Sequence, residues 1–206
     1  MHNLPECHIR VDHLDPTVIM PLYHRGVFLA PQCGTTVQDF LEHTCHLQAD
    51  YIRSRIQTIF LDGHPVDDTA HTTLDQDATL ALSAAMPGLV GATMRSGGQF
   101  AALREGISYT CSPSAAPGSE APILIRLKLF NFLAKEVGPD LLQNGVILPR
   151  ADWVQWLSSA DALWPHCLRM TYDGQDLDCS PQIATNSVWP EHIQFRLSTT
   201  SPTSLS

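Results

Sequence analysis

The chain has 206 residues, of which 44% are hydrophobic and 16% are charged. That apolar fraction is enough for folded cores, and the charged fraction is too low for a self-repelling, disordered chain. With 12 basic and 21 acidic side chains, the formal net charge is -9. Binding to nucleic acid needs lysine and arginine to displace counterions from phosphate, so this composition argues against a nucleic-acid partner.

The start of the chain and its longest uncharged stretch bear on localisation. Polar His2, Asn3 and Glu6 follow Met1, so no basic stretch leads into an apolar run of the secretory type. The uncharged stretch 78–94 is broken by proline and glycine and is shorter than the roughly 20 apolar residues of a membrane-spanning helix. The six cysteines show no Cys-x-x-Cys spacing and fit reduced thiols. We expect a cytoplasmic protein without a membrane partner.

A segment of small residues divides the chain. Residues 111–122 contain three prolines and nothing large enough to bury, a composition that favours an extended interdomain linker. This predicts a first domain over residues 1–110 and a second over 123–198. The Ser/Thr/Pro-rich residues 199–206 are predicted to be a disordered tail.

Both segments show the same signals in the same chain order. Each is predicted to open with a strand (residues 8–11 and 123–129), followed by a second strand that glycine introduces (26–29 and 145–148). A helix comes next, capped by Thr36 over Val37, Phe40, Leu41 and Thr44 in one segment, and by Asp152 over Trp153, Trp156, Leu157 and Ala160 in the other. An Asp-Gly hairpin (59–66 and 170–177) and a last strand (79–83 and 193–198) complete each series.

The spacing between these signals is nearly constant. Arg10 and Arg126 of the opening strands are 116 residues apart, the hairpin turns are 111 apart, and Leu82 and Leu197 of the last strands are 115 apart. A shared order with small changes of offset predicts an old internal duplication.

Two strands, a helix across them and two more strands form a mixed sheet around one helix, which resembles the β-grasp topology of ubiquitin-like proteins. We therefore predict an α+β fold with two β-grasp-like domains, each a mixed sheet of about four strands packed on one helix. Residues 125–138 resemble the opening of the small subunit of molybdopterin synthase. Residues 60–68 and 78–82 resemble its closing part, and the thiamine-pathway sulfur carrier shares the plan.

The resemblance implies a function for a diglycine. In such carriers a tail ending in Gly-Gly follows the last strand, an activating enzyme adenylates its carboxylate, and a thiocarboxylate forms. Gly97 and Gly98 stand about where such a tail would end, but the chain continues to Ser206. A sulfur carrier would therefore need proteolytic processing to free the carboxylate of Gly98, and its partner would be an activating or sulfur-transfer enzyme. Carriers of this kind typically dock their partner on a short apolar patch of the sheet.

The segment that holds the diglycine is more apolar than a loop needs to be. Residues 84–108 form a glycine-rich extension of the first domain, which we predict to contact a partner protein, its own sheet or the second domain. The predicted partner-binding residues are Met86, Leu89, Val90, Met94, Phe100 and Leu103.

Other chemistry finds little support. On a helix His43 and His46 share a face while Cys45 projects away, so this cluster makes a poor zinc site. No nucleotide-binding loop, calcium loop or hydrolase motif is present, so we predict no catalytic residues, no metal and no cofactor. The leading hypothesis is a non-enzymatic protein-interaction module, in a sulfur-transfer or cofactor pathway. The alternatives are the processed carrier and an enzyme with its site between the two domains.

Overall fold

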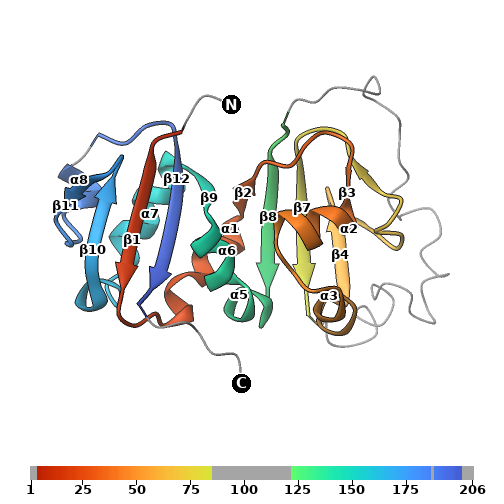
Figure 1. Cartoon of the computed structure of the whole chain (residues 1–206), viewed down its shortest axis with the longest axis horizontal. Helices are drawn as coiled ribbons and strands as arrows, with labels where there is room; N and C mark the ends of the chain where they lie inside the picture. Colours follow the sequence, from red (N-terminus) through yellow and green to blue (C-terminus); the bar gives the residue numbers. More distant parts are fainter. Residues whose placement is uncertain (1–3, 85–121, 187, 201–206) are drawn as a thin grey trace. The chain divides into compact units, whose positions relative to one another are not determined.

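The computed structural model describes residues 4–84, 122–186 and 188–200, and the chain forms two compact units (Figure 1). Unit 1 consists of Met1–Val27 and Lys135–Ser206, and unit 2 consists of Phe28–Ala134. Each unit combines helices with a mixed sheet, so the predicted α+β class is confirmed. No helix among these residues has the length and apolar character needed to cross a membrane.

Unit 2 holds five neighbouring strands in the order β2-β8-β7-β4-β5. Their bounds are β2 (Val27–Leu29), β8 (Ile125–Phe130), β7 (Ala78–Ser83), β4 (Thr58–Leu61) and β5 (His64–Pro65). β7 runs parallel to β8 and antiparallel to β4, which forms a hairpin with β5. A separate two-stranded ladder pairs β3 (Thr35–Thr36) with β6 (Thr73–Leu74). The helical segments are α2 (Val37–Asp39), the π-helical turn η2 (Phe40–Thr44), α3 (Ala49–Arg55) and α5 (Leu133–Glu136), which continues into unit 1.

Unit 1 holds five neighbouring strands in the order β11-β10-β1-β12-β9. Their bounds are β11 (Gln175–Leu177), β10 (Cys167–Tyr172), β1 (Glu6–Val11), β12 (His192–Thr199) and β9 (Val146–Pro149). β1 runs parallel to β12 and antiparallel to β10. The helical segments are η1 (Pro16–Val18), α1 (Met20–Arg25), α6 (Gly138–Asn144), α7 (Arg150–Ser159), η4 (Trp164–His166) and α8 (Ile183–Asn186).

The core of unit 2 depends on β8. Strict alternation along this strand buries Ile125, Leu127 and Leu129 completely. Burying one such side chain contributes about 1.5–3 kcal/mol, so these three contribute roughly 5–9 kcal/mol as an upper bound. A whole domain is typically stable by only about 5–15 kcal/mol. Unit 2 therefore needs β8 in order to fold.

Aromatic side chains form the core of unit 1. The ring of Trp153 on α7 lies 5.6 Å from Trp156, 5.4 Å from Trp189 and 4.8 Å from Phe195 of β12, between ring centroids. The Trp156 indole N–H donates to the carbonyl of Val18 over 2.9 Å, which fixes the segment before α1 against α7. Core packing of the α7 tryptophans, as the helix spacing predicts, is confirmed.

The two units share local structure at corresponding positions. Gly26 after α1 has φ 104° and ψ 133°, and Gly145 after α6 has φ 103° and ψ 134°. Each glycine N–H donates to the carbonyl four residues back, of Leu22 or Leu141. A side chain disfavours this positive φ, which explains why glycine introduces both following strands.

The Asp-Gly hairpins show the same equivalence in more detail. Asp62 and Asp173 both have positive φ, 48° and 46°, and each precedes a glycine that also has positive φ. The N–H of Asp62 donates to Thr79 O over 2.9 Å, and its carboxylate accepts from Thr79 N over 2.7 Å. Asp173 makes the same two bonds with Glu6, both of 2.9 Å. In unit 1, β1 therefore stands where β7 stands in unit 2.

This arrangement corrects the predicted division of the chain. We expected the domains 1–110 and 123–198 each to keep their own opening strand, but β1 belongs to unit 1 and β8 to unit 2. The two opening strands are thus exchanged between the predicted halves. β1 takes the position of the last strand β7 and not that of β8, so the predicted equivalence of the two opening strands is wrong. The expectation of about four strands in each sheet is also wrong, because five neighbouring strands lie in each unit. Alternation shows which side of a strand is buried, but not which strand lies beside it.

The two predicted helix caps have different outcomes. Thr36 caps α2 as predicted, since its hydroxyl accepts from Asp39 N over 3.0 Å. Asp152 is not a cap, because α7 begins two residues earlier at Arg150. Pro149 occupies the N-cap position there and makes no side-chain hydrogen bond. Of the predicted tail, Thr199 still belongs to β12, and residues 201–206 lie outside the described part of the chain.

Gly138 at the start of α6 makes the closest contact that a substitution can test. A Cβ added there would lie 2.7 Å from Tyr23 Cε2 and 3.2 Å from Ile19 Cδ1. The Tyr23 ring is fully buried, and its hydroxyl donates to Gly138 O over 2.6 Å, so it has no room to move. We predict that Gly138→Ala lowers the free energy of unfolding by about 1–3 kcal/mol, the usual cost of overpacking.

Tryptophan fluorescence in urea measures this effect, because all four tryptophans of the sequence belong to unit 1. The matched control is Gln143→Ala at an exposed position of the same helix, which should change the free energy by less than about 0.5 kcal/mol. Equal unfolding midpoints for the two variants would contradict the packing of Tyr23 on Gly138.

Candidate functional site

The site residues predicted from sequence lie outside the part of the chain that the structure describes. This holds for the predicted partner-binding residues Met86, Leu89, Val90, Met94, Phe100 and Leu103, and for the diglycine Gly97 and Gly98. They stay predictions, and the candidate sites below come from other residues.

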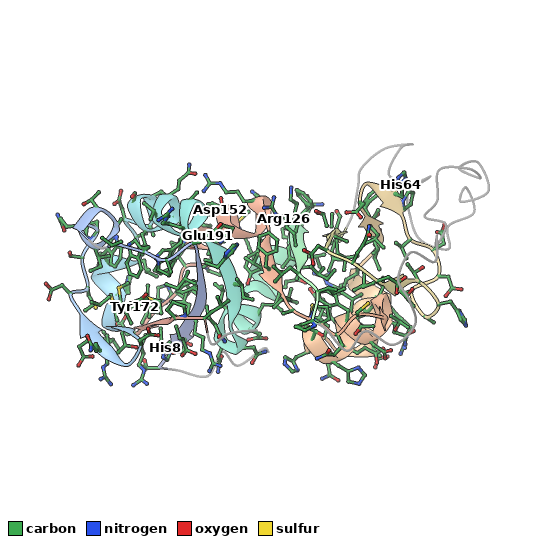
Figure 2. All side chains as sticks on the ribbon, turned by 90° about the horizontal axis from the view of Figure 1, so that it is seen from above. His8, His64, Arg126, Asp152, Tyr172 and Glu191 are labelled. Carbon is green, nitrogen blue, oxygen red and sulfur yellow. The ribbon has the colours of Figure 1, made fainter. Side chains whose placement is uncertain are left out.

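One face of the unit 1 sheet is polar and largely cationic. Cys7, Ile9 and Val11 of β1 point into the core, so the alternate residues of β1 and of its neighbours face away from it. Figure 2 shows His8 of β1 on the opposite side of unit 1 from Asp152, which lies on α7. We call this surface the cationic face; its residues are His8, Arg10, Arg169, Arg196 and Ser198.

The strand register brings these five side chains together. Arg10 lies directly opposite Arg169 in the antiparallel β1–β10 pair and beside Ser198 in the parallel β1–β12 pair. His8 lies beside Arg196, and its Nε2 is 2.8 Å from the Ser198 hydroxyl. The cationic face thus covers three neighbouring strands.

Acidic side chains balance the cationic face only in part. Arg169 Nε donates to Asp176 over 2.6 Å. Arg196 Nε is 3.6 Å from a Glu6 oxygen, which is within reach of an ion pair but too far for a hydrogen bond. The same nitrogen is buried from solvent without a hydrogen-bond partner, and Arg10 makes no ion pair with the described residues.

The surroundings of His8 shift its titration. Partial burial is the main cause that lowers the pKa of His8 below its ordinary value, and Arg10 is the second. Arg196 and Arg169 lower the pKa further, whereas Glu6 opposes them. Burial, reinforced by the surrounding arginines, therefore favours the neutral imidazole.

The unit 2 sheet has a face of a different kind, on the side away from the buried leucines of β8. Arg126 and Lys128 alternate with the buried leucines of β8 and are half-buried, as are Phe28, Phe60 and Ala81 on neighbouring strands. Phe130 at the end of β8 is 38% exposed. We call this surface the aromatic face; its residues are Phe28, Phe60, Ala81, Arg126, Lys128 and Phe130.

Rows of paired residues cross the aromatic face. Phe60, Ala81 and Lys128 form one row across β4, β7 and β8, and Phe130 follows in the next row beside Ser83. The guanidinium carbon of Arg126, labelled in Figure 2, lies 4.7 Å from the centroid of the Phe28 ring, a cation–π contact. Apolar rings and cations thus share one side of the sheet.

Three of the cysteines that the structure describes are poorly suited to act as nucleophiles. Burial raises the pKa of the Cys7 and Cys45 thiols far above their ordinary value. Burial, with a hydrogen bond to Cys179, raises the pKa of Cys167 to about 12. A nucleophilic cysteine needs a low pKa, so these environments favour inert thiols.

No set of three metal ligands comes together in the described ranges 4–84, 122–186 and 188–200. His43, from the histidine cluster that the sequence singles out, pairs with Asp39 over 3.7 Å, while Cys45 is buried. His166 Nδ1 lies 2.8 Å from an Asp12 oxygen, with the ring of His13 at 5.2 Å from that of His166.

The sequence holds a partial signal for both faces. Polar and apolar residues alternate along 6–11, 125–130 and 192–199, which predicts strands with one open side. The missing information is which strands are neighbours, because the two faces form only when β1 pairs with β12 and β8 pairs with β7.

The chain was compared with known protein families, proteins and structures. No protein-family model, curated protein or solved structure matches the chain. The two faces therefore rest on their own geometry.

We predict that His8 titrates below pH 6.5 in the folded protein, measured from its ring signals in an NMR pH titration. Since its folded pKa lies below the unfolded value, its contribution to stability is present above about pH 6.5 and is lost as the pH falls toward the folded pKa. Arg10→Ala should raise the pKa only part of the way, because burial remains.

The control for this titration is Arg53→Ala, which removes an equal charge from α3 of unit 2. It should leave the His8 titration unchanged. A His8 pKa at or above 6.5 in the native protein would contradict the arrangement of arginines around it.

Proposed function

We propose that this chain is a non-enzymatic protein-interaction module built from two β-grasp-like units. In this proposal the aromatic face of unit 2 docks an acidic, partly apolar segment of a partner protein, and the pathway is one of sulfur transfer or cofactor synthesis. The observation that carries the proposal is the pattern of Phe60, Ala81, Lys128, Arg126 and Phe130 on one face of the sheet.

The content of unit 2 supports the β-grasp part of the proposal. The segments that resemble the opening and closing parts of the molybdopterin synthase small subunit lie on either side of the linker in sequence. Both contribute to unit 2, where β8 pairs in parallel with β7 and β7 pairs with the hairpin strand β4. Unit 2 thus contains an opening strand, a second strand, a helix, a hairpin and a last strand.

The composition of the aromatic face supports a protein as the partner. Aromatic residues and arginine are enriched in protein interfaces, where large rings supply contact area and guanidinium groups supply oriented hydrogen bonds. Phe60 and Ala81 lie side by side across β4 and β7, so a small side chain stands next to a large ring. Phe130 is exposed and Phe28 and Phe60 are half-buried, so three rings gather on one face.

The positive charges of Arg126 and Lys128 favour an acidic partner. Arg126 and Lys128 make no ion pair with the described residues. The nearby carboxylates of Asp62 and Asp77 accept hydrogen bonds from backbone N–H groups at the strand ends, at 2.7 Å from Thr79 N and Leu124 N respectively. Two cations between phenylalanine rings are complementary to acidic residues that flank an apolar one.

We predict that a photo-reactive phenylalanine analogue placed at Ala81 forms one discrete adduct with a second protein in the native host. Arg126→Glu combined with Lys128→Glu should weaken binding at least tenfold, about 1.4 kcal/mol, and abolish that adduct, because it turns attraction into repulsion. Mass spectrometry of the adduct should identify an acidic segment at the cross-linked site.

The matched control is Lys135→Glu, an exposed position outside the aromatic face, which should leave the adduct intact. Circular dichroism establishes that the charge-reversed protein is folded. Cross-links confined to the protein's own chain, or an adduct that survives the double charge reversal, would refute docking at the aromatic face.

A further inference from the structure

The cationic face of unit 1 is unusual for the charge of this protein. The whole chain has 12 basic side chains against 21 acidic ones, yet three arginines gather on three neighbouring strands. Arg10 and Arg169 are opposed directly across an antiparallel pair, a placement of like charges that destabilises a sheet. Asp176 offsets this repulsion in part through its bond to Arg169, and a bound anion would offset more of it.

The donors of the cationic face are incompletely used. Arg196 Nε has no hydrogen-bond partner although it is buried from solvent, and the nearest Glu6 oxygen is 3.6 Å away. A buried donor on a charged group is costly when it is left unpaired. Arg10 makes no ion pair within the part of the chain that the structure describes. The exposed Arg10 guanidinium thus keeps its donors available for an outside acceptor, and the Arg196 side chain, 41% exposed, presents the remainder of its guanidinium group beside it.

Arg196 lies close to a glycine of the same unit. A Cβ at Gly145 would lie 3.3 Å from Arg196 Nε, so the arginine side chain rests against this glycine at the end of α6. The positive φ of 103° keeps position 145 suited to glycine.

The arrangement of side chains on the cationic face favours phosphate over a single carboxylate. His8 and Arg10 on β1 stand beside Arg196 and Ser198 on β12, which places two guanidinium forks, an imidazole and a hydroxyl in one patch. Guanidinium groups match the oxygen geometry of carboxylate and phosphate, but a single carboxylate needs only one of them. A phosphate group carries more charge and more acceptor oxygens. Three strands about 4.8 Å apart span roughly 10 Å, the scale of a small molecule.

We propose that the cationic face binds the phosphate groups of a small phosphate-bearing molecule, held by Arg10, Arg196, His8 and Ser198, with Arg169 at the margin. This site is independent of the aromatic face and of its protein partner. Binding involves no covalent step.

The first test titrates the full-length protein with inorganic pyrophosphate at constant ionic strength and follows the ring signals of His8 by NMR. We expect a saturable change of these signals and a rise of the His8 pKa, because a bound anion favours the imidazolium form. A merely structural cluster would not show this rise. If matched sodium chloride reproduces the change, or no saturation occurs up to millimolar pyrophosphate, the proposal is overturned.

A second test compares pyrophosphate binding by two arginine variants. Arg10→Ala should weaken pyrophosphate binding at least tenfold, whereas Arg53→Ala in unit 2 removes the same charge and should change it less than twofold. An equal loss in both variants would mean general charge attraction and would overturn the proposal.

Without anion, Arg10→Ala should leave the urea midpoint of tryptophan fluorescence unchanged or raise it, since it relieves the repulsion with Arg169. A lower midpoint would assign Arg10 a structural role and contradict the site.

Adenosine diphosphate distinguishes the source of the phosphate. Binding as tight as that of pyrophosphate would support a site for the diphosphate group itself. Tighter binding would support a site for a nucleotide, with further contacts beyond the phosphates. Binding more than tenfold weaker than that of pyrophosphate would contradict recognition of a phosphate-bearing organic molecule.

Discussion

The parallel pairing of β7 with β8 in unit 2, and of β1 with β12 in unit 1, is the constraint on which the rest of the structure depends. Each pair joins a strand from before the linker to one from after it. Parallel neighbours need a long connection, and roughly 40 residues separate the end of β7 from the start of β8. The pairing places three fully buried side chains of β8 in unit 2 and three of β1 in unit 1. Neither unit has a complete core without the strand it receives.

Both open faces follow from this exchange. The row of Phe60, Ala81 and Lys128 contains residues from both sides of the linker, and so does the patch of His8, Arg10, Arg196 and Ser198. Each surface is therefore present only in the complete chain. The two faces differ in chemistry, because one mixes phenylalanine rings with cations while the other gathers arginines around a neutral histidine. That difference supports distinct ligands for the two units.

Local features of the fold could be predicted from sequence, because their causes are local. The Asp-Gly turns at Asp62 and Asp173 require positive φ, and the cap at Thr36 requires a hydroxyl three residues before its amide donor. The prediction of a cap at Asp152 fails because helix propensity does not fix the first residue; the N–H of Arg150 instead donates to Glu191 O, 2.8 Å away.

Strand neighbours could not be predicted in the same way. The shared order of signals is equally compatible with opening strands kept in their own halves or exchanged, since β1 and β8 present similar alternating patterns. The balance is decided by long-range packing, which no short pattern encodes. The aromatic and cationic faces were missed for the same reason, although the residues that form them alternate visibly along their strands.

Nuclear Overhauser effects between methyl groups in the full-length protein test the exchange most directly. We expect contacts between Leu82 and Leu129 and between Ile9 and Leu197, which are register partners in the parallel pairs β7–β8 and β1–β12. Contacts that instead join Ile9 to Leu82 and Leu129 to Leu197 would show that each half keeps its own opening strand, and would contradict this account of both units and of both faces.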